Sequence, residues 1–140
     1  MIDVERCCGC FACAAACAEK FIQFQDEEHV RRYSGLRTCA ALCDACQRVC
    51  PVNAIELVPD DGLEEPCAPA SFTWSVALAP CRKCGQTYTT EKLRRLLVEK
   101  LQAHMGSGAE PPDWIALCPV CRRDDEAHRL RAATRTFQGS

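Results

Sequence analysis

The residues best suited to chemistry in this 140-residue chain are fourteen cysteines, ten per cent of the total. The first run of them, CCGCFACAAAC (7–17), places Cys7, Cys10, Cys13 and Cys17 at the spacing C-x2-C-x2-C-x3-C. Bacterial [4Fe–4S] ligand runs have this spacing, and the fourth cysteine of such a run ligates the other of two clusters. Three close thiolates reach three corners of one cubane, and the fourth points away. The run therefore predicts an iron–sulfur site.

A second run, CAALCDACQRVCP (39–51), repeats the pattern with one extra residue between its first two cysteines. Exchange of the fourth ligands between the runs predicts one [4Fe–4S] cluster on Cys7, Cys10, Cys13 and Cys50. It predicts a second cluster on Cys39, Cys43, Cys46 and Cys17. We expect Cys39 to remain a ligand on a slightly wider loop, because the inserted stretch adds no competing thiolate. The alternative, that the extra residue displaces Cys39 from the site, stays open.

Two features depart from the usual run. Ala18 stands where proline often follows the fourth cysteine, and the glycine common after the second cysteine is Phe11 in one run and Asp44 in the other. These changes alter loop geometry without removing a ligand. Cys8, adjacent to a ligand, is expected to be buried and inert with its side chain pointing elsewhere, and Cys67 to be an ordinary cysteine.

A third group consists of two Cys-x2-Cys turns, CRKCG (81–85) and CPVCR (118–122). Such turns direct backbone N–H groups at the sulfurs, and two of them make a tetrahedral S4 site that suits zinc or a single iron. Thirty-three residues separate the turns, more than a simple ribbon needs, and an inserted helix accounts for the excess. We predict one Zn²⁺ at Cys81, Cys84, Cys118 and Cys121, with iron or a further iron–sulfur cluster as the alternative.

The expected cellular compartment favours metal binding by these cysteines over disulfide bonds. The N-terminus is acidic and carries no apolar stretch typical of a signal peptide, and no segment approaches the roughly 18 apolar residues of a membrane span. A cytoplasmic chain with reduced thiols is expected. Residues 1–66 carry a net charge of −6 and residues 67–140 a net charge of +4, so nucleic acid is an improbable partner for the first half. No nucleophile triad, phosphate loop or carboxylate pair indicates an enzyme.

The cysteine groups divide the chain into predicted parts. These are a two-cluster domain (1–58), a Pro- and acid-rich linker (59–71), a CxxC…CxxC metal module (72–124) and a polar tail (125–140). The two runs form an internal repeat, and each half is expected to give a strand, a ligand loop, a brief helix and another strand. Beyond the linker, 72–79 reads as a strand and 89–104 as a helix whose leucines face the Cys-x2-Cys turns. The stretch after Cys121 is expected to form a short exposed helix.

The predicted fold class is therefore α+β: a bacterial two-[4Fe–4S] ferredoxin-like domain followed by a small zinc-ribbon or rubredoxin-knuckle-like module with an inserted helix. The chain resembles the small ferredoxin-like iron–sulfur subunit of formate hydrogenlyase and related membrane-bound [NiFe] hydrogenases, which is itself similar to the ferredoxin-like subunit of complex I. The matching stretches are ERCCGCFACAAAC, ACQRVCPVNAIEL, SVALAPCRKCGQTYTTEKL and WIALCPVCRR. The ferredoxin runs are common to many electron carriers, and the distal half is the more discriminating part.

The resemblance implies a non-catalytic electron-transfer subunit of a hydrogenase- or formate dehydrogenase-like complex. Its partners would be other redox subunits, and any association with a membrane would run through them. Two rivals remain: a redox-sensing or nucleic-acid-interacting regulator, and a free soluble ferredoxin. Tight, salt-dependent binding of DNA or RNA would favour the first rival. Stable co-purification with larger subunits would count against the second.

Overall fold

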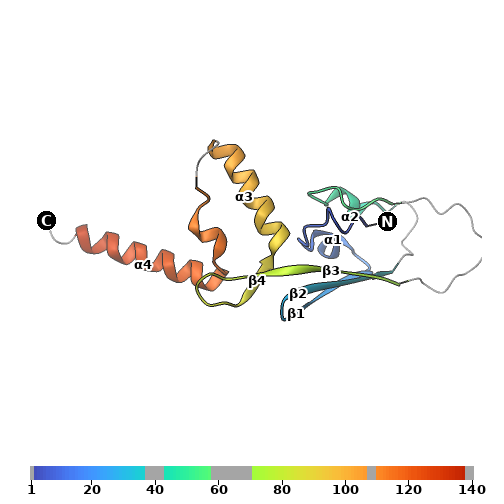
Figure 1. The fold of residues 1–140 in the computed structure, drawn as a ribbon, viewed down its shortest axis with the longest axis horizontal. Coiled ribbons are helices and arrows are strands. Elements are labelled where there is room, and N and C mark those ends of the chain that lie inside the picture. Colours follow the sequence, from blue (N-terminus) through green and yellow to red (C-terminus); the bar gives the residue numbers. More distant parts are fainter. Residues whose placement is uncertain (1, 37–42, 58–70, 107–109, 138–140) are drawn as a thin grey trace, which may run out of the picture.

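The computed structural model describes residues 2–36, 43–57, 71–106 and 110–137. These residues form helices and a four-stranded antiparallel sheet with the strand order β1-β2-β3-β4 (Figure 1). This mixed composition is compatible with the predicted α+β class.

The sheet begins with a hairpin of β1 (Ile22–Glu27) and β2 (Val30–Leu36). Glu27 pairs with Val30, so only two residues make the turn. Side chains alternate between the faces of a strand, and in β2 Arg31 and Tyr33 are buried whereas Arg32 and Ser34 are exposed. One face of the hairpin therefore packs on the cysteine-bearing segments and the other faces solvent.

Strand β3 (Ser71–Pro80) follows the predicted linker and agrees with the strand expected at 72–79. It pairs with β2 from Val30↔Ala77 to Leu36↔Ser71. Segments on the two sides of the predicted linker thus belong to one sheet. The linker itself lies almost wholly outside the described residues, as do Cys39 and Cys67.

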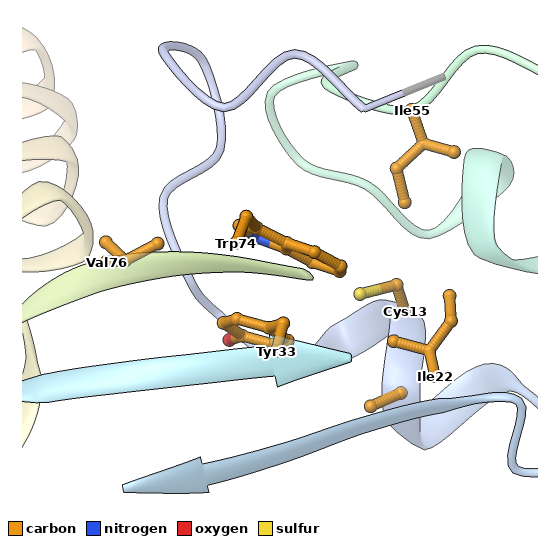
Figure 2. Packing of buried hydrophobic residues seen from close by; sticks show 7 residues of the cluster. Cys13, Ile22, Tyr33, Ile55, Trp74 and Val76 are labelled. Atoms are coloured by element: carbon orange, nitrogen blue, oxygen red, sulfur yellow. The ribbon is translucent and has the colours of Figure 1, made fainter. Parts of the chain in front are cut away.

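The main core lies between this sheet and the cysteine-bearing segments (Figure 2). Tyr33 stacks on Trp74 with ring centroids 4.6 Å apart and an interplanar angle of 8°. Figure 2 shows the Cys13 sulfur directed toward the Trp74 ring. The buried members of the core are Cys13, Ala14, Ile22, Tyr33, Ile55, Trp74 and Val76.

The predicted internal repeat is visible in the turns that follow each run. Helix α1 (Ala12–Ala16) ends one residue before Cys17, and helix α2 (Ala45–Arg48) ends two residues before Cys50. After each fourth cysteine a residue adopts positive φ, Lys20 at 57° and Asn53 at 48°. The expected strand pattern differs, however: β1 follows the first run, but Ile55 after the second run makes only an isolated bridge with Ile2. Within the described ranges, only Ile2 and Asp3 pair with the segment at Ala54 and Ile55. Two residues are too few to form a β-ladder.

The remaining elements build the distal half. Strand β4 (Thr87–Thr90) pairs with β3 and leads into α3 (Glu91–Met105), which confirms the helix expected at 89–104. The Thr90 hydroxyl caps α3 by accepting a hydrogen bond from the Leu93 N–H (3.1 Å), and Gly106 ends it with φ 98°. Helix α3 packs on β3, β4 and the short 3₁₀ helix η1 (Asp113–Ala116), but none of its residues is fully buried.

Helix α4 (Pro119–Phe137) is longer than the short helix predicted after Cys121, because it starts within the second Cys-x2-Cys turn. In Figure 1 it extends away from the sheet. Among the described residues no helix combines the length and apolar character that crossing a membrane requires.

Candidate metal centres

Four predicted ligands from the two N-terminal runs line one cavity, together with Cys8. Cys7, Cys10 and Cys13 come from the first run and Cys50 from the second, and apolar residues such as Ile2 and Ile55 complete the lining. The N-terminal segment brings the runs together, because the Asp3 N–H donates to the Ala54 carbonyl (2.8 Å). The carbonyl of Asp3 in turn accepts from the Cys7 N–H (3.0 Å), and its carboxylate caps the following turn. These are the four cysteines assigned above to the first cluster.

The ligand loop of the first run needs left-handed backbone at two positions. Gly9 has φ 68°, and a Cβ there would lie 2.7 Å from the Thr90 methyl group. Phe11 has φ 56°, a conformation that costs a bulky side chain roughly 1–2 kcal/mol. The phenyl ring of Phe11 stacks on Phe24 (5.5 Å between centroids), which compensates part of that cost.

Two residues of the distal half donate hydrogen bonds to the first ligand loop and to the segment before it. The Thr90 hydroxyl donates to the Cys8 carbonyl, and the Lys92 ammonium donates to the carbonyls of Val4 (2.9 Å) and Glu5 (2.8 Å). Cys8 is buried, as predicted, but it lines the same cavity as the predicted ligands. The ligand loop thus depends on elements more than eighty residues further along the chain.

The thiols that line this cavity differ in pKa. The pKa of the Cys10 thiol is lowered to about 6, chiefly by the hydrogen bond from Cys8 and further by the Ala12 N–H and the charge of Arg31, against the effect of burial. Burial raises the pKa of Cys13 to about 11. Metal ligation requires thiolates, and a bound cation supplies the charge that stabilises them. In the absence of a metal, Cys13 would be the harder thiol to ionise.

Two buried donors on the sheet side of the cavity lack acceptors. The Tyr33 hydroxyl and the Trp74 indole N–H are buried and have no hydrogen-bond partner within the described residues. Unpaired buried donors are rare and call for an explanation, such as an unseen group. Both residues also line the cavity of the four cysteines. A sulfur-rich group in that cavity would offer the missing acceptors, so the lining fits the predicted cluster.

A buried guanidinium on the same face was not anticipated from the sequence. Arg31 donates to the Gly9 carbonyl (3.0 Å) and forms a bidentate pair with Asp26 (2.6 and 2.8 Å). It also lies over the rings of Phe11 (5.5 Å) and Phe24 (4.9 Å). The signal that could have revealed it is the alternation of a strand, which places residues 31, 33 and 35 on one face.

The remaining N-terminal cysteines lie around α1 and α2, which contact each other. The Cys17 sulfur accepts a hydrogen bond from the Phe21 N–H (3.3 Å), and the Cys50 sulfur accepts one from the Ala54 N–H (3.2 Å). The same four-residue turn thus orients the fourth cysteine of each run. Burial raises the pKa of Cys46, and the nearby sulfurs of Cys43 and Cys17 raise it further. Cys39, the fourth predicted ligand here, lies outside the described residues.

The third group forms a compact set of sulfurs. The Sγ atoms of Cys81, Cys84, Cys118 and Cys121 all lie within 4.8 Å of one another, and the group can hold a metal ion. Zinc–sulfur bonds of about 2.3 Å in a tetrahedron place sulfurs roughly 3.8 Å apart. The observed Cys84–Cys118 distance is 3.8 Å. The sulfur spacing is therefore compatible with an S4 ion site.

Backbone N–H groups point at these sulfurs as the Cys-x2-Cys turns predict. The Cys118 N–H donates to Cys81 Sγ (3.2 Å) and the Cys121 N–H to Cys118 Sγ (3.4 Å), while Gly85 completes the first turn with φ 75°. Although burial opposes it, the pKa of Cys81 is lowered to about 6 by the N–H groups of Cys118, Cys84 and Lys83. These dipoles stabilise a thiolate before any ion binds.

Two ion pairs at the surface connect the two Cys-x2-Cys turns. Arg82 pairs with Asp113 (2.8 Å) and Lys83 with Asp125 (2.6 Å), each joining the first turn to the segment around the second. Leu117 and Tyr88 pack against the cysteines. Three of the four cysteines are thus buried, and Cys84 is exposed.

No protein-family model matches the chain, and comparison with curated proteins gives no match either. The class of the protein therefore follows from its own site: a cysteine-rich chain with a four-cysteine group that can hold a metal ion.

Proposed function

We propose that the protein is a non-catalytic electron-transfer subunit that carries two [4Fe–4S] clusters and one Zn²⁺. The observation that carries the proposal is the meeting of Cys50 with Cys7, Cys10 and Cys13 at one cavity. Two independent metal sites, each served by its own run, would not require that crossing. An exchange of fourth ligands between two clusters does.

The assignment of ligands follows from these positions. Cys7, Cys10, Cys13 and Cys50 would hold the first cluster, and Cys39, Cys43, Cys46 and Cys17 the second. When bound, such clusters exchange single electrons reversibly at potentials set by charge, hydrogen bonds and solvent exposure. The chain's own contribution is to donate the Phe21 and Ala54 N–H groups to ligand sulfurs. It also keeps the first cavity apolar.

Zinc is the proposed ion at Cys81, Cys84, Cys118 and Cys121, because zinc is held structurally by four thiolates in closed sites. This module would act as a brace. Thr90 and Lys92, which follow its first turn, bind carbonyls of the first ligand loop. The resemblance to the small subunit of formate hydrogenlyase and related [NiFe] hydrogenases extends the proposal to partners, namely the redox subunits of such a complex.

Metal analysis of anaerobically purified protein tests the proposal. We expect about eight irons, eight sulfides and one zinc per chain, with [4Fe–4S] signals in electron paramagnetic resonance (EPR) spectra of the reduced protein. Two variants serve as controls for each other. Cys50→Ser should lower the iron content toward about four while zinc stays at one. Cys84→Ser should lower zinc while iron stays at about eight.

Two outcomes would contradict the proposal. Wild-type protein that binds zinc but no iron and sulfide would refute the electron-transfer function. Loss of zinc and retention of all iron in Cys50→Ser would refute the ligand crossing. Cys39→Ser tests whether Cys39 is a ligand of the second cluster. Unchanged iron content and EPR signals in this variant would show that it is not.

A further inference from the structure

Two adjacent arginines in β2 form nearly identical ion pairs on opposite faces of the hairpin. Arg31 binds Asp26 through two hydrogen bonds (2.6 and 2.8 Å), and Arg32 binds Glu27 in the same way (3.2 and 3.0 Å). The side chain of Arg31 is 7% exposed and that of Arg32 is 55% exposed. The guanidinium of Arg31 lies against the first ligand loop, and the pair of Arg32 and Glu27 faces solvent.

Arg31 contacts the first ligand loop directly. Its Nη1 atom donates to the Gly9 carbonyl (3.0 Å), and its guanidinium lies over the ring of Phe11 (5.5 Å). These two residues flank Cys10. Among the described residues Arg31 is also the only charged one that is buried. Its charge therefore acts on the first cluster site through little intervening water.

The countercharge does not cancel this effect. The Asp26 side chain is 45% exposed, so water screens its charge more than that of the guanidinium. Hydrogen bonding from Arg31 lowers the pKa of Asp26, and the carboxylate remains ionised at neutral pH. The ion pair thus presents its positive end to the ligand loop and its negative end to solvent.

We propose that the charge of Arg31 raises the reduction potential of the cluster held by Cys7, Cys10, Cys13 and Cys50. The inference rests on the proposed function. One electron enters from a one-electron donor, such as a redox centre of a partner subunit. No bond forms or breaks, and Arg31 stays protonated throughout. A fixed buried cation stabilises the more negative, reduced state, so Arg31 favours reduction of this cluster.

Redox titration followed by EPR tests the inference with variants of opposite expected sign. Arg31→Gln should lower the reduction potential of the first cluster. At a fixed applied potential, the ratio of reduced to oxidised cluster should fall at least threefold, which corresponds to a shift of about 28 mV at 59 mV per tenfold change. Asp26→Asn removes the countercharge and should raise that ratio. A merely structural role would not shift the two variants in opposite directions.

Matched controls separate charge from packing. Arg32→Gln and Glu27→Gln break the solvent-facing pair and should change the ratio less than twofold. Arg31→Lys keeps the charge but loses the bidentate geometry, and its potential should stay close to that of the wild type. If Arg31→Gln does not fold, Asp26→Asn and Arg31→Lys still test the sign and the role of charge.

Several results would overturn the inference. These are an unchanged potential in Arg31→Gln, shifts of equal sign in Arg31→Gln and Asp26→Asn, or a shift in Arg31→Lys as large as in Arg31→Gln. A protein without iron and sulfide would instead refute the proposed function. Metal analysis before the titration distinguishes that failure from this one.

Discussion

Thr90 makes the closest connection between the first ligand loop and the distal half, and its hydroxyl group can be removed almost alone. The residue is fully buried. Its Oγ1 accepts from the Leu93 N–H (3.1 Å) as the cap of α3 and donates to the Cys8 carbonyl. Thr90→Val keeps the shape of the side chain and deletes both hydrogen bonds.

The expected loss follows from these two bonds. Loss of a helix cap costs about 1 kcal/mol, and a buried carbonyl deprived of its donor costs about 1–3 kcal/mol. Together they predict a destabilisation of about 2–4 kcal/mol, which corresponds to a fall in Tm of roughly 8–15 °C for a chain of this size. Thr90→Ser keeps the hydroxyl and loses one methyl group, about 1 kcal/mol or roughly 4 °C.

Thermal unfolding of the metal-loaded proteins, followed by circular dichroism under anaerobic conditions, measures both values. Metal content is determined first, so that variants are compared at equal loading. A Tm for Thr90→Val within about 3 °C of the wild type would refute the role assigned to the hydroxyl. Equal losses in the valine and serine variants would show that volume, and not hydrogen bonding, is what the site requires.

Three further predictions concern the sheet, acid stability and the third site. Gly35→Ala should destabilise the protein by about 1–3 kcal/mol in urea unfolding, because a Cβ would lie 2.5 Å from the Phe72 ring, and adding Phe72→Leu should recover part of the loss. Arg31 lowers the pKa of Asp26. The ion pair therefore stabilises the folded state fully at pH values above the ordinary carboxyl pKa of about 4. This stabilisation is lost as the pH falls through the lowered pKa of Asp26. The stability of Asp26→Asn should consequently fall less than that of the wild type in that range. Acid should release the ion of the third site, because protons compete for thiolates, and a zinc indicator should find less bound zinc in Cys84→Ser than in the wild type at each pH.

Features determined by neighbouring residues could be predicted from the sequence. The Cys-x2-Cys turns depend on four or five consecutive residues, and α3 follows from the leucine period within residues 89–104. The pairing of β2 with β3 could not be predicted, because it joins Tyr33 to Trp74 across the linker and no local pattern specifies a distant strand. Arg31 was missed for a related reason: VRRYSGL does not alternate cleanly between polar and apolar residues.

The attachment of Lys92 to the carbonyls of Val4 and Glu5 has a consequence for how the protein is made. A ribosome adds roughly 5–20 residues per second, so about 75 residues and roughly 4–15 s separate the synthesis of Cys17 from that of Lys92. Until the end of this interval the first run lacks Lys92, and for most of it the run also lacks Trp74 and Thr90. The complete first site, with all its supporting contacts, is therefore available only late in synthesis.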